Sequence, residues 1–189
     1  MSKKLRMFFE FRIPLISYVL LGIIIAILFF TGHQFYPLSV ITSQIGCILV
    51  VFGLLIRILA SVTTKYLGKI KITGVYAICR QPMLLAQFFI IIGFNFIILN
   101  PIFFVSSLII FFANDVLAMT KYDSILEYYY REIWQIYKSQ TRFVLPFTKR
   151  IKDVFSKSLS VNELDNSSNT FIFIAIYALL VEIAMFSSI

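Results

Sequence analysis

The chain has 189 residues, of which 60% are hydrophobic and only 14% are charged, and its formal net charge is +8. A soluble domain is usually about 45–50% apolar and about 25% charged. This composition disfavours an ordinary water-soluble globule and excludes intrinsic disorder. We therefore expect one compact unit of a few helices that lies in a lipid bilayer.

Five long apolar runs predict helices. In chain order they are Ile13 to Thr31, Val40 to Val62, Met83 to Leu99, Ile102 to Met119 and Thr170 to Ile189. A spanning helix needs about 20 apolar residues, so the first two runs qualify comfortably and the third and fourth are short. Because only Asn100-Pro101 separates the short runs, we expect a tight hairpin. The predicted fold class is all-α, a polytopic membrane bundle of four to five transmembrane helices that includes this hairpin.

The first run follows a basic start and so resembles a signal peptide. It is longer than a typical signal-peptide core, however, and the residues at 32–37 lack a small-x-small cleavage pattern. We therefore expect a retained membrane anchor.

The basic residues fall on one side of the predicted spans. They occupy the N-terminal tail, the 63–82 connection and the 120–169 segment, whereas the connections at 32–39 and 100–101 carry no Lys or Arg. The positive-inside rule places the N-terminus and both basic segments in the cytoplasm. We expect a multi-pass integral membrane protein, in a bacterial inner membrane rather than the endoplasmic reticulum. The positive charge then sets topology and attracts anionic lipid, and no nucleic-acid partner is expected.

Cysteine and histidine usage predicts neither a disulfide nor a metal site. Cys47 lies within the second run and Cys79 in the 63–82 connection, at different depths and in a reducing compartment. The sequence has a single histidine, His33, without metal-ligand spacing around it. We also find no phosphate-binding or nucleophile-elbow motif and no internal repeat.

The connection before the third run concentrates residues that suit an anion site. Gly74 permits a turn, and Pro82 opens the following helix at a favoured early position. Arg80 and Gln81 then lie at a helix N-terminus, where a guanidinium and backbone N–H groups favour a carboxylate or phosphate. In the alternative interpretation, Arg80 reaches lipid headgroups and Tyr76 belongs to an interfacial aromatic belt.

An amphipathic helix is predicted at about 120–139, at or emerging from the cytoplasmic membrane surface. Its apolar positions recur at helical spacing; they are Tyr122, Ile125, Leu126, Tyr129, Tyr130, Ile133, Trp134 and Tyr137. Glu127 and Arg131 are spaced as an ion pair. Asp123 is expected in the first turn, where it either favours the helix start through the dipole or faces the same cavity as Arg80.

These residues, in this order, resemble the integral-membrane methyltransferases that include isoprenylcysteine carboxyl methyltransferases and phospholipid N-methyltransferases. The matching positions are Gly53 and Arg57; Gly74, Tyr76, Arg80 and Pro82; Asp123 and Leu126; Trp134 and Tyr137; and Leu145-Pro146. The resemblance is strongest over 46–147. It implies a core at 1–147. Outside the resemblance, we expect a cytoplasmic linker at 148–169 from its polar composition and an extra hydrophobic helix at 170–189 from its apolar run.

The resemblance implies a pocket for S-adenosylmethionine and methyl transfer to a lipophilic or small acceptor at the cytoplasmic face. The implied catalytic residues are Arg80 and Asp123. The implied cofactor-binding residues are Gly74, Tyr76, Arg80, Gln81, Pro82 and Asp123. The chain departs from the family pattern at Val75, Gln81, Leu84 and Tyr122. These departures leave open an inactive relative that acts as a membrane interaction or assembly protein.

Two acidic residues lie inside apolar runs. Asp115 is either a functional group or a structural partner of Arg57, and Glu182 is expected to be structural or interfacial. The hypothesis that the chain is a small transporter or channel subunit would rest on these two carboxylates alone.

Overall fold

A computed structural model of the protein describes residues 13–30, 40–62, 66–67, 70–71 and 74–144. Within these ranges the regular secondary structure is helical except for one short β-ladder and an isolated bridge, which confirms the all-α class. The predictions for the N-terminal tail, His33, Leu145-Pro146, the 148–169 linker, and the 170–189 helix with Glu182 lie outside the described residues.

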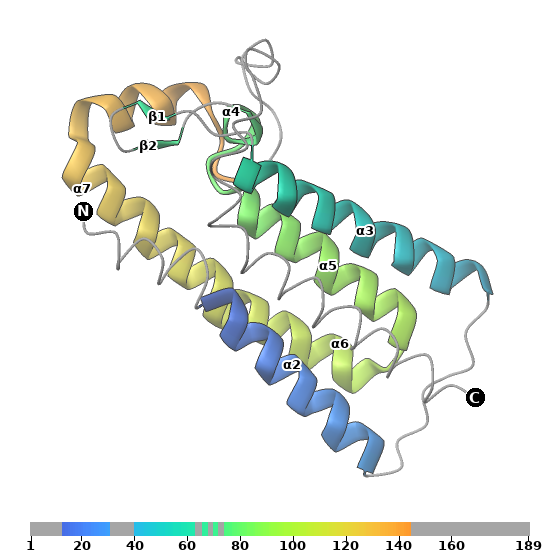
Figure 1. Ribbon diagram of the computed structural model, residues 1–189. Helices are drawn as coiled ribbons and strands as arrows, with labels where there is room; N and C mark the ends of the chain where they lie inside the picture. Colours follow the sequence, from blue (N-terminus) through green and yellow to red (C-terminus); the bar gives the residue numbers. More distant parts are fainter. Residues whose placement is uncertain (1–12, 31–39, 63–65, 68–69, 72–73, 145–189) are drawn as a thin grey trace.

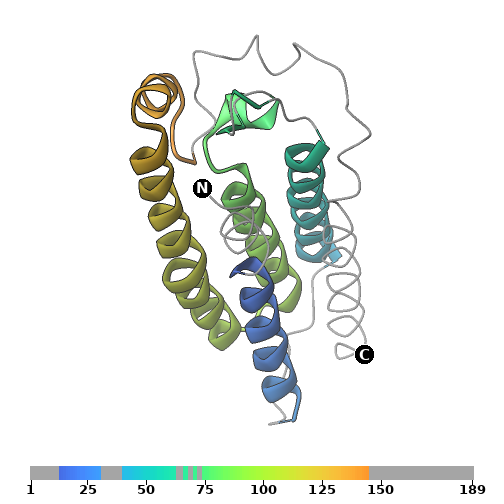
Figure 2. The ribbon, with the colours of Figure 1, turned by 60° about the vertical axis from the view of Figure 1, so that its left-hand side comes forward.

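The helices form an elongated bundle (Figures 1 and 2). They are α2 (Ile13–Phe30), α3 (Val40–Val62), α4 (Val75–Ile78), α5 (Pro82–Ile98), α6 (Pro101–Ile110) and α7 (Leu117–Gln140), with a π-helical segment η2 (Phe111–Val116) between α6 and α7. The strands β1 (Tyr66–Leu67) and β2 (Ile70–Lys71) pair antiparallel, with Tyr66 opposite Lys71. Helix α3 lies along α5, and α2 packs against α6 and η2.

Glycines allow α3 and α5 to approach closely. A Cβ atom on Gly93 would lie 2.7 Å from the carbonyl oxygen of Gly46, and one on Gly53 would lie 2.8 Å from that of Ala86. Small residues at a helix contact let the two backbones come together without side chains between them. This contact fixes α5, whose N-terminus carries the candidate site.

The predicted hairpin is confirmed between α5 and α6. Helix α5 ends in the left-handed residue Leu99, with φ of 47°. The Asn100 side chain then accepts hydrogen bonds from the backbone N–H groups of Ile102 and Phe103, at 2.9 and 3.1 Å. Pro101 stands at the first position of α6, where its missing N–H is not needed.

Helices α6 and α7 are one continuous helix through η2, from Pro101 to Gln140. The sequence predicted a new helix near residue 120, and this boundary is wrong. Asp123 therefore lies well inside a helix, so the interpretation that it stabilises a helix start is wrong as well. The chain bends instead at Tyr130, whose φ of −128° and ψ of 27° are not helical. Beyond Tyr130, the distal half of α7 turns across the end of the bundle (Figures 1 and 2).

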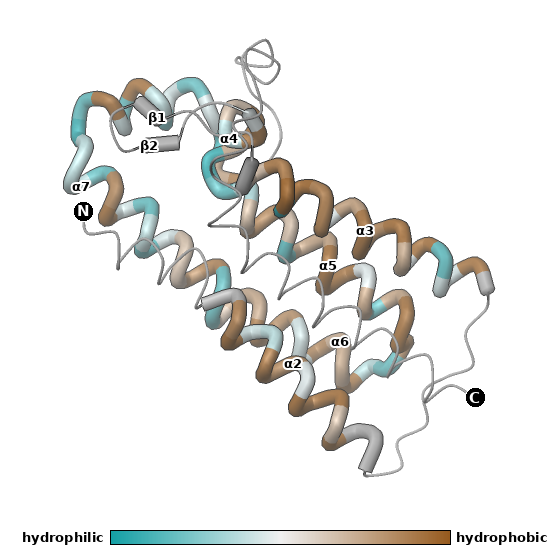
Figure 3. The backbone as a smooth tube through the Cα atoms, in the orientation of Figure 1, coloured by the Kyte–Doolittle hydropathy of each residue, from teal (hydrophilic) through white to brown (hydrophobic). Residues whose placement is uncertain are grey.

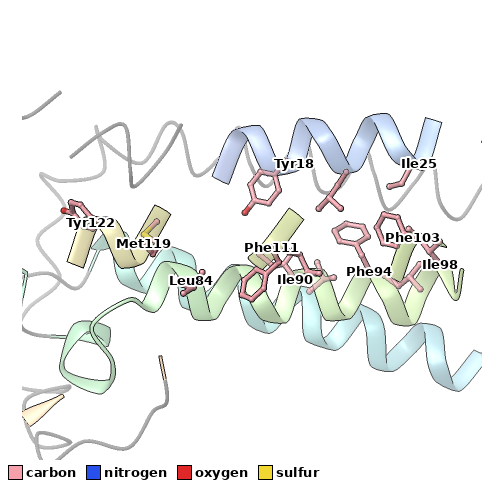
Figure 4. Close-up of a cluster of buried hydrophobic side chains, with 14 of the residues drawn as sticks. Tyr18, Ile25, Leu84, Ile90, Phe94, Ile98, Phe103, Phe111, Met119 and Tyr122 are labelled. Carbon is pink, nitrogen blue, oxygen red and sulfur yellow. The ribbon is translucent and has the colours of Figure 1, made fainter. Parts of the chain in front are cut away.

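Apolar side chains cover much of the outside of the bundle as well as its core. Two helical stretches, Ile41–Ala60 and Pro101–Gln140, are long and apolar enough to cross a membrane by length and composition, while Leu15–Ile27 and Pro82–Ile98 are shorter. Inside, Tyr18 and Ile25 of α2 face Phe94 and Phe103 of the hairpin (Figure 4). Hydrophilic residues are most frequent around α4 and the distal half of α7 (Figure 3).

Candidate functional site

The candidate site lies at the end of the bundle where α4, the start of α5 and the distal half of α7 meet (Figure 1). Gly74 begins the segment that leads into it, with φ of 64° and ψ of −135°, a conformation that L side chains rarely adopt. Its carbonyl oxygen accepts a hydrogen bond from the Ala77 N–H at 3.0 Å and so closes the turn into α4. The predicted turn at Gly74 is confirmed.

The residues between α4 and α5 are held by the chain that follows α7. The Arg80 N–H donates to the Arg142 carbonyl at 2.9 Å, and the Gln81 N–H donates to the Phe143 carbonyl at 3.0 Å. One turn earlier, the Tyr137 hydroxyl donates to the Tyr76 carbonyl at 2.6 Å. These contacts fix the two backbone segments that carry the site relative to each other.

Arg80 and Asp123 form an ion pair inside this junction. The distance from Arg80 Nη1 to Asp123 Oδ2 is 3.1 Å, and the two side chains are only 8% and 11% exposed. The guanidinium carbon lies 6.0 Å from the ring centre of Trp134 and 5.7 Å from that of Phe143. Two charges are thus held among aromatic rings, where removing either partner leaves a buried charge uncompensated.

The environment of Asp123 makes its carboxyl group harder to ionise. Burial raises the pKa of the Asp123 carboxyl above its ordinary value, and this effect outweighs the opposing attraction of Arg80 and Lys138. Glu127 adds to the increase through like-charge repulsion. A second cationic or hydrogen-bond-donating group would therefore stabilise the carboxylate at this position.

Four buried polar atoms around the ion pair have no hydrogen-bond partner within the described residues. Three are donors, namely Arg80 Nε, Gln81 Nε2 and Trp134 Nε1, and the fourth is the acceptor Asp123 Oδ1. Leaving such a buried group unsatisfied costs about 1–3 kcal/mol. Native proteins bury few such groups, and a concentration of them calls for an explanation such as a binding site. Together they match a small ligand that carries both a hydrogen-bond-accepting anion and a donor or cation.

The structure brings together three of the predicted site residues, Arg80, Gln81 and Asp123. The Arg80 side chain turns inward, so the interpretation that it reaches lipid headgroups is wrong. Pro82 is buried at the first position of α5 and Gly74 forms the preceding turn, so both shape the backbone.

Tyr76 occupies a different position from the one expected of an interfacial aromatic residue. It is buried and packs in a small cluster with Ile56, Ala60 and Met83. The interpretation as part of an exposed aromatic belt is therefore wrong, and the contribution of Tyr76 to the junction is its backbone carbonyl.

The sequence matched Trp134 to a spaced aromatic position of the family but did not predict that it lies beside Arg80. Trp134 lies beyond the bend at Tyr130, and this bend sets its position. Phe143 was not singled out from the sequence. The expected pair of Glu127 with Arg131 differs from the structure, where Glu127 pairs with Lys138 at 2.9 Å across the bend in α7. Within the described part of the chain, no three metal-ligating side chains come together.

The hydrophobic core explains the position of Leu84, one of the departures from the family pattern. Its side chain is buried in the same core cluster as Met119 and Tyr122 (Figure 4). It therefore contributes packing at this point.

Comparisons with protein-family models, curated proteins and solved structures found no match. The resemblance to membrane methyltransferases stays a prediction that rests on the motifs themselves.

Proposed function

We propose that this chain is a multi-pass membrane protein whose candidate site faces the cytoplasm. The distribution of polarity supports the proposal, because large apolar side chains such as Ile41, Val51 and Ile109 are more than half exposed while Arg57 and Asp115 are buried. A soluble monomer rarely exposes apolar patches of this extent, whereas lipid-facing helices do. The one-sided distribution of basic residues supports a cytoplasmic position for the end that holds Arg80.

We further propose that the site binds S-adenosylmethionine and that the protein transfers a methyl group to a lipophilic or small acceptor. The observation that carries this proposal is the set of unpartnered polar atoms around the Arg80–Asp123 pair. The donors of Arg80, Gln81 and Trp134 suit the carboxylate of the amino-acid end of the cofactor. The free oxygen of Asp123 suits its ammonium group.

The contribution of the protein to such a reaction is binding and alignment. When bound, the cofactor supplies an already activated methyl group on a sulfonium. Arg80 and Asp123 would fix its orientation through charge-assisted hydrogen bonds, which are stronger than neutral ones. The surrounding rings of Trp134 and Phe143 exclude water. Proximity and desolvation then supply much of the rate, with no proton transfer required of the ion pair.

The test is binding of S-adenosylmethionine to the detergent-purified protein by calorimetry. We expect Arg80→Ala and Asp123→Asn each to weaken binding at least about tenfold, since each removes a buried charge-assisted contact. Arg131→Ala is the matched control, because it removes an exposed arginine from the same helix as Asp123. Absence of binding at millimolar cofactor, or equal affinity of the three variants, would refute the proposal.

The alternative function is a catalytically inactive relative that acts in membrane interaction or assembly. It is favoured by Gln81, whose amide cannot change charge near neutral pH as the family histidine can. Transfer of a radiolabelled methyl group into membrane extracts distinguishes the two. Binding without transfer to any lipid or small-molecule fraction would favour the inactive relative.

A further inference from the structure

A second group of polar side chains meets deep in the bundle, between α2, α3, α5 and η2. Its members are Ser17, Tyr18, Arg57, Gln87, Asn114 and Asp115. All are buried except Asn114, which is half-buried. We call this group the inner cluster.

Hydrogen bonds connect the inner cluster through two neighbouring residues of α2. The Ser17 hydroxyl donates to Asp115 Oδ1 at 3.0 Å and accepts from Asn114 Nδ2 at 2.6 Å. The Tyr18 hydroxyl donates to Gln87 Oε1 and accepts from Arg57 Nη1 at 2.8 Å. The alternative that Asp115 serves in a structural network near Arg57 is thus supported, with Ser17 and Tyr18 as the intervening contacts.

The π-helical turn brings Asn114 and Asp115 to the same hydroxyl. Successive residues of an α-helix point about 100° apart, and a π-turn adds one residue to the turn. Both side chains of η2 reach Ser17 in this wider turn. Such turns occur frequently at functional sites.

The inner cluster includes an acceptor and a donor that have no partner in the part of the chain that the structure describes, namely Asp115 Oδ2 and Gln87 Nε2. Their side chains are each 1% exposed. Burial without a partner is costly for both, more so in a bilayer-like environment. The cluster already contains one guanidinium and one carboxyl group, so an additional charged ligand would leave an unbalanced charge.

We propose that the inner cluster binds the hydroxyl group of a lipophilic alcohol. A hydroxyl is neutral, donates one hydrogen bond and accepts others, and so suits an unpartnered acceptor and an unpartnered donor together. Ile16, Phe112 and Leu117, each within two positions of a cluster residue in the sequence, are about half exposed and suit contact with a hydrocarbon chain.

The inner cluster and the candidate site occur one after the other along the same two stretches of chain. Gln87 follows Gln81 by six residues, or about 9 Å of helix, and Asp115 precedes Asp123 by eight, or about 12 Å. Leu84 and Met119, which lie between these positions in the sequence, are buried in the same core cluster (Figure 4). Assigning the bound alcohol as the methyl acceptor rests on the proposed function, whereas the binding of the alcohol does not.

The test uses the full-length protein in detergent without cofactor. The probe is hexadecanol carrying a diazirine in its chain, and the matched control probe is hexadecane with the same diazirine. After irradiation, mass spectrometry of the peptides locates the label. We expect labelling of α2, α5 or η2 by the alcohol to exceed that by the hydrocarbon about tenfold, and unlabelled hexadecanol to compete.

Two variants test whether the alcohol binds at the inner cluster. Asp115→Asn replaces the unpartnered oxygen by a donor and should reduce alcohol labelling about tenfold. Ser107→Ala is the control, because it removes a buried hydroxyl of the same hairpin that is already paired with Asn95 at 2.9 Å, and should leave labelling unchanged.

Equal labelling by the two probes, or equal reduction by both variants, would overturn the proposal. If Asp115→Asn does not fold, the competition between hexadecanol and hexadecane on the unsubstituted protein decides. Because S-adenosylmethionine is absent throughout, failure of the methyltransferase proposal leaves this outcome unaffected.

Discussion

Asp123 shows how burial acts on a single charged side chain. Its carboxyl is buried beside Arg80 and keeps one oxygen without a partner within the described residues. The pKa of the group is raised mainly because burial penalises the charged form. The order of Gly74, Arg80 and Asp123 along the sequence was enough to predict that they share one end of the bundle. The donor role of Trp134 was not predicted, because it depends on where α7 bends.

The contribution of Asp123 to stability should fall as the pH rises. Since the pKa is raised on folding, this contribution is fully present below the ordinary carboxyl pKa and is lost as the pH rises through the raised value. We expect the unfolding temperature of Asp123→Asn, taken relative to that of the unsubstituted protein, to be higher at pH 8 than at pH 4. Glu132→Gln, an exposed carboxyl of the same helix, is the control and should show no such change. A relative unfolding temperature that falls between pH 4 and pH 8 would contradict the argument.

Cys79 should be chemically inert in the folded protein. It is fully buried beside the site, and burial raises the pKa of its thiol to about 12. The thiolate, which is the reactive form, is then scarce at physiological pH. In a Cys47→Ala background we expect no maleimide labelling of Cys79 up to pH 9 within an hour, and complete labelling after denaturation. Rapid labelling of the folded protein would show that this junction opens.

At the scale of elements, the α3–α5 contact and the long α6–α7 helix set the positions of the polar residues. The hairpin at Asn100-Pro101 was predictable, because both residues have strong local preferences. The bend at Tyr130 was not, because neither proline nor glycine marks it in the sequence. The predicted apolar stripe of α7 consequently divides into buried residues such as Leu126 and Trp134 and exposed ones such as Tyr129 and Ile133.

Adding one methyl group to the α3–α5 contact should destabilise the bundle. A Cβ atom at Gly93 would lie 2.7 Å from the Gly46 carbonyl oxygen, which is backbone and cannot rotate away. We expect Gly93→Ala to lower the free energy of unfolding by about 1–3 kcal/mol, measured by chemical denaturation in detergent. Gly22→Ala, a glycine-to-alanine change within α2, should be neutral or slightly stabilising. Equal stability of the two variants would show that the helices can separate at no cost.

At the scale of the whole molecule, apolar residues lie outside and several polar residues lie inside. Composition and run lengths predicted the helices, but the convergence of Ser17, Arg57 and Asp115 required the tertiary packing. Residues nearly a hundred positions apart, such as Ser17 and Asp115, come together only once α2 docks on η2. Local sequence patterns contain no information about such a pairing.

The proposed topology predicts opposite labelling of the two ends of the bundle. In a background of Cys47→Ala and Cys79→Ala, Ile102→Cys lies at the α5–α6 turn and Ser139→Cys on the distal half of α7. We expect a membrane-impermeant maleimide added to intact cells to label the first, and to label the second only after the membrane is permeabilised. The reverse pattern would place the candidate site outside the cytoplasm.

The helix that runs from Pro101 to the bend at Tyr130 contains both Asp115 and Asp123. A rotation of this helix about its axis would therefore move both carboxyl groups together. The π-helical segment contains one residue more than an α-helical register needs. Returning it to α-helical form would turn the following helix by about 100° and carry Asp123 away from Arg80.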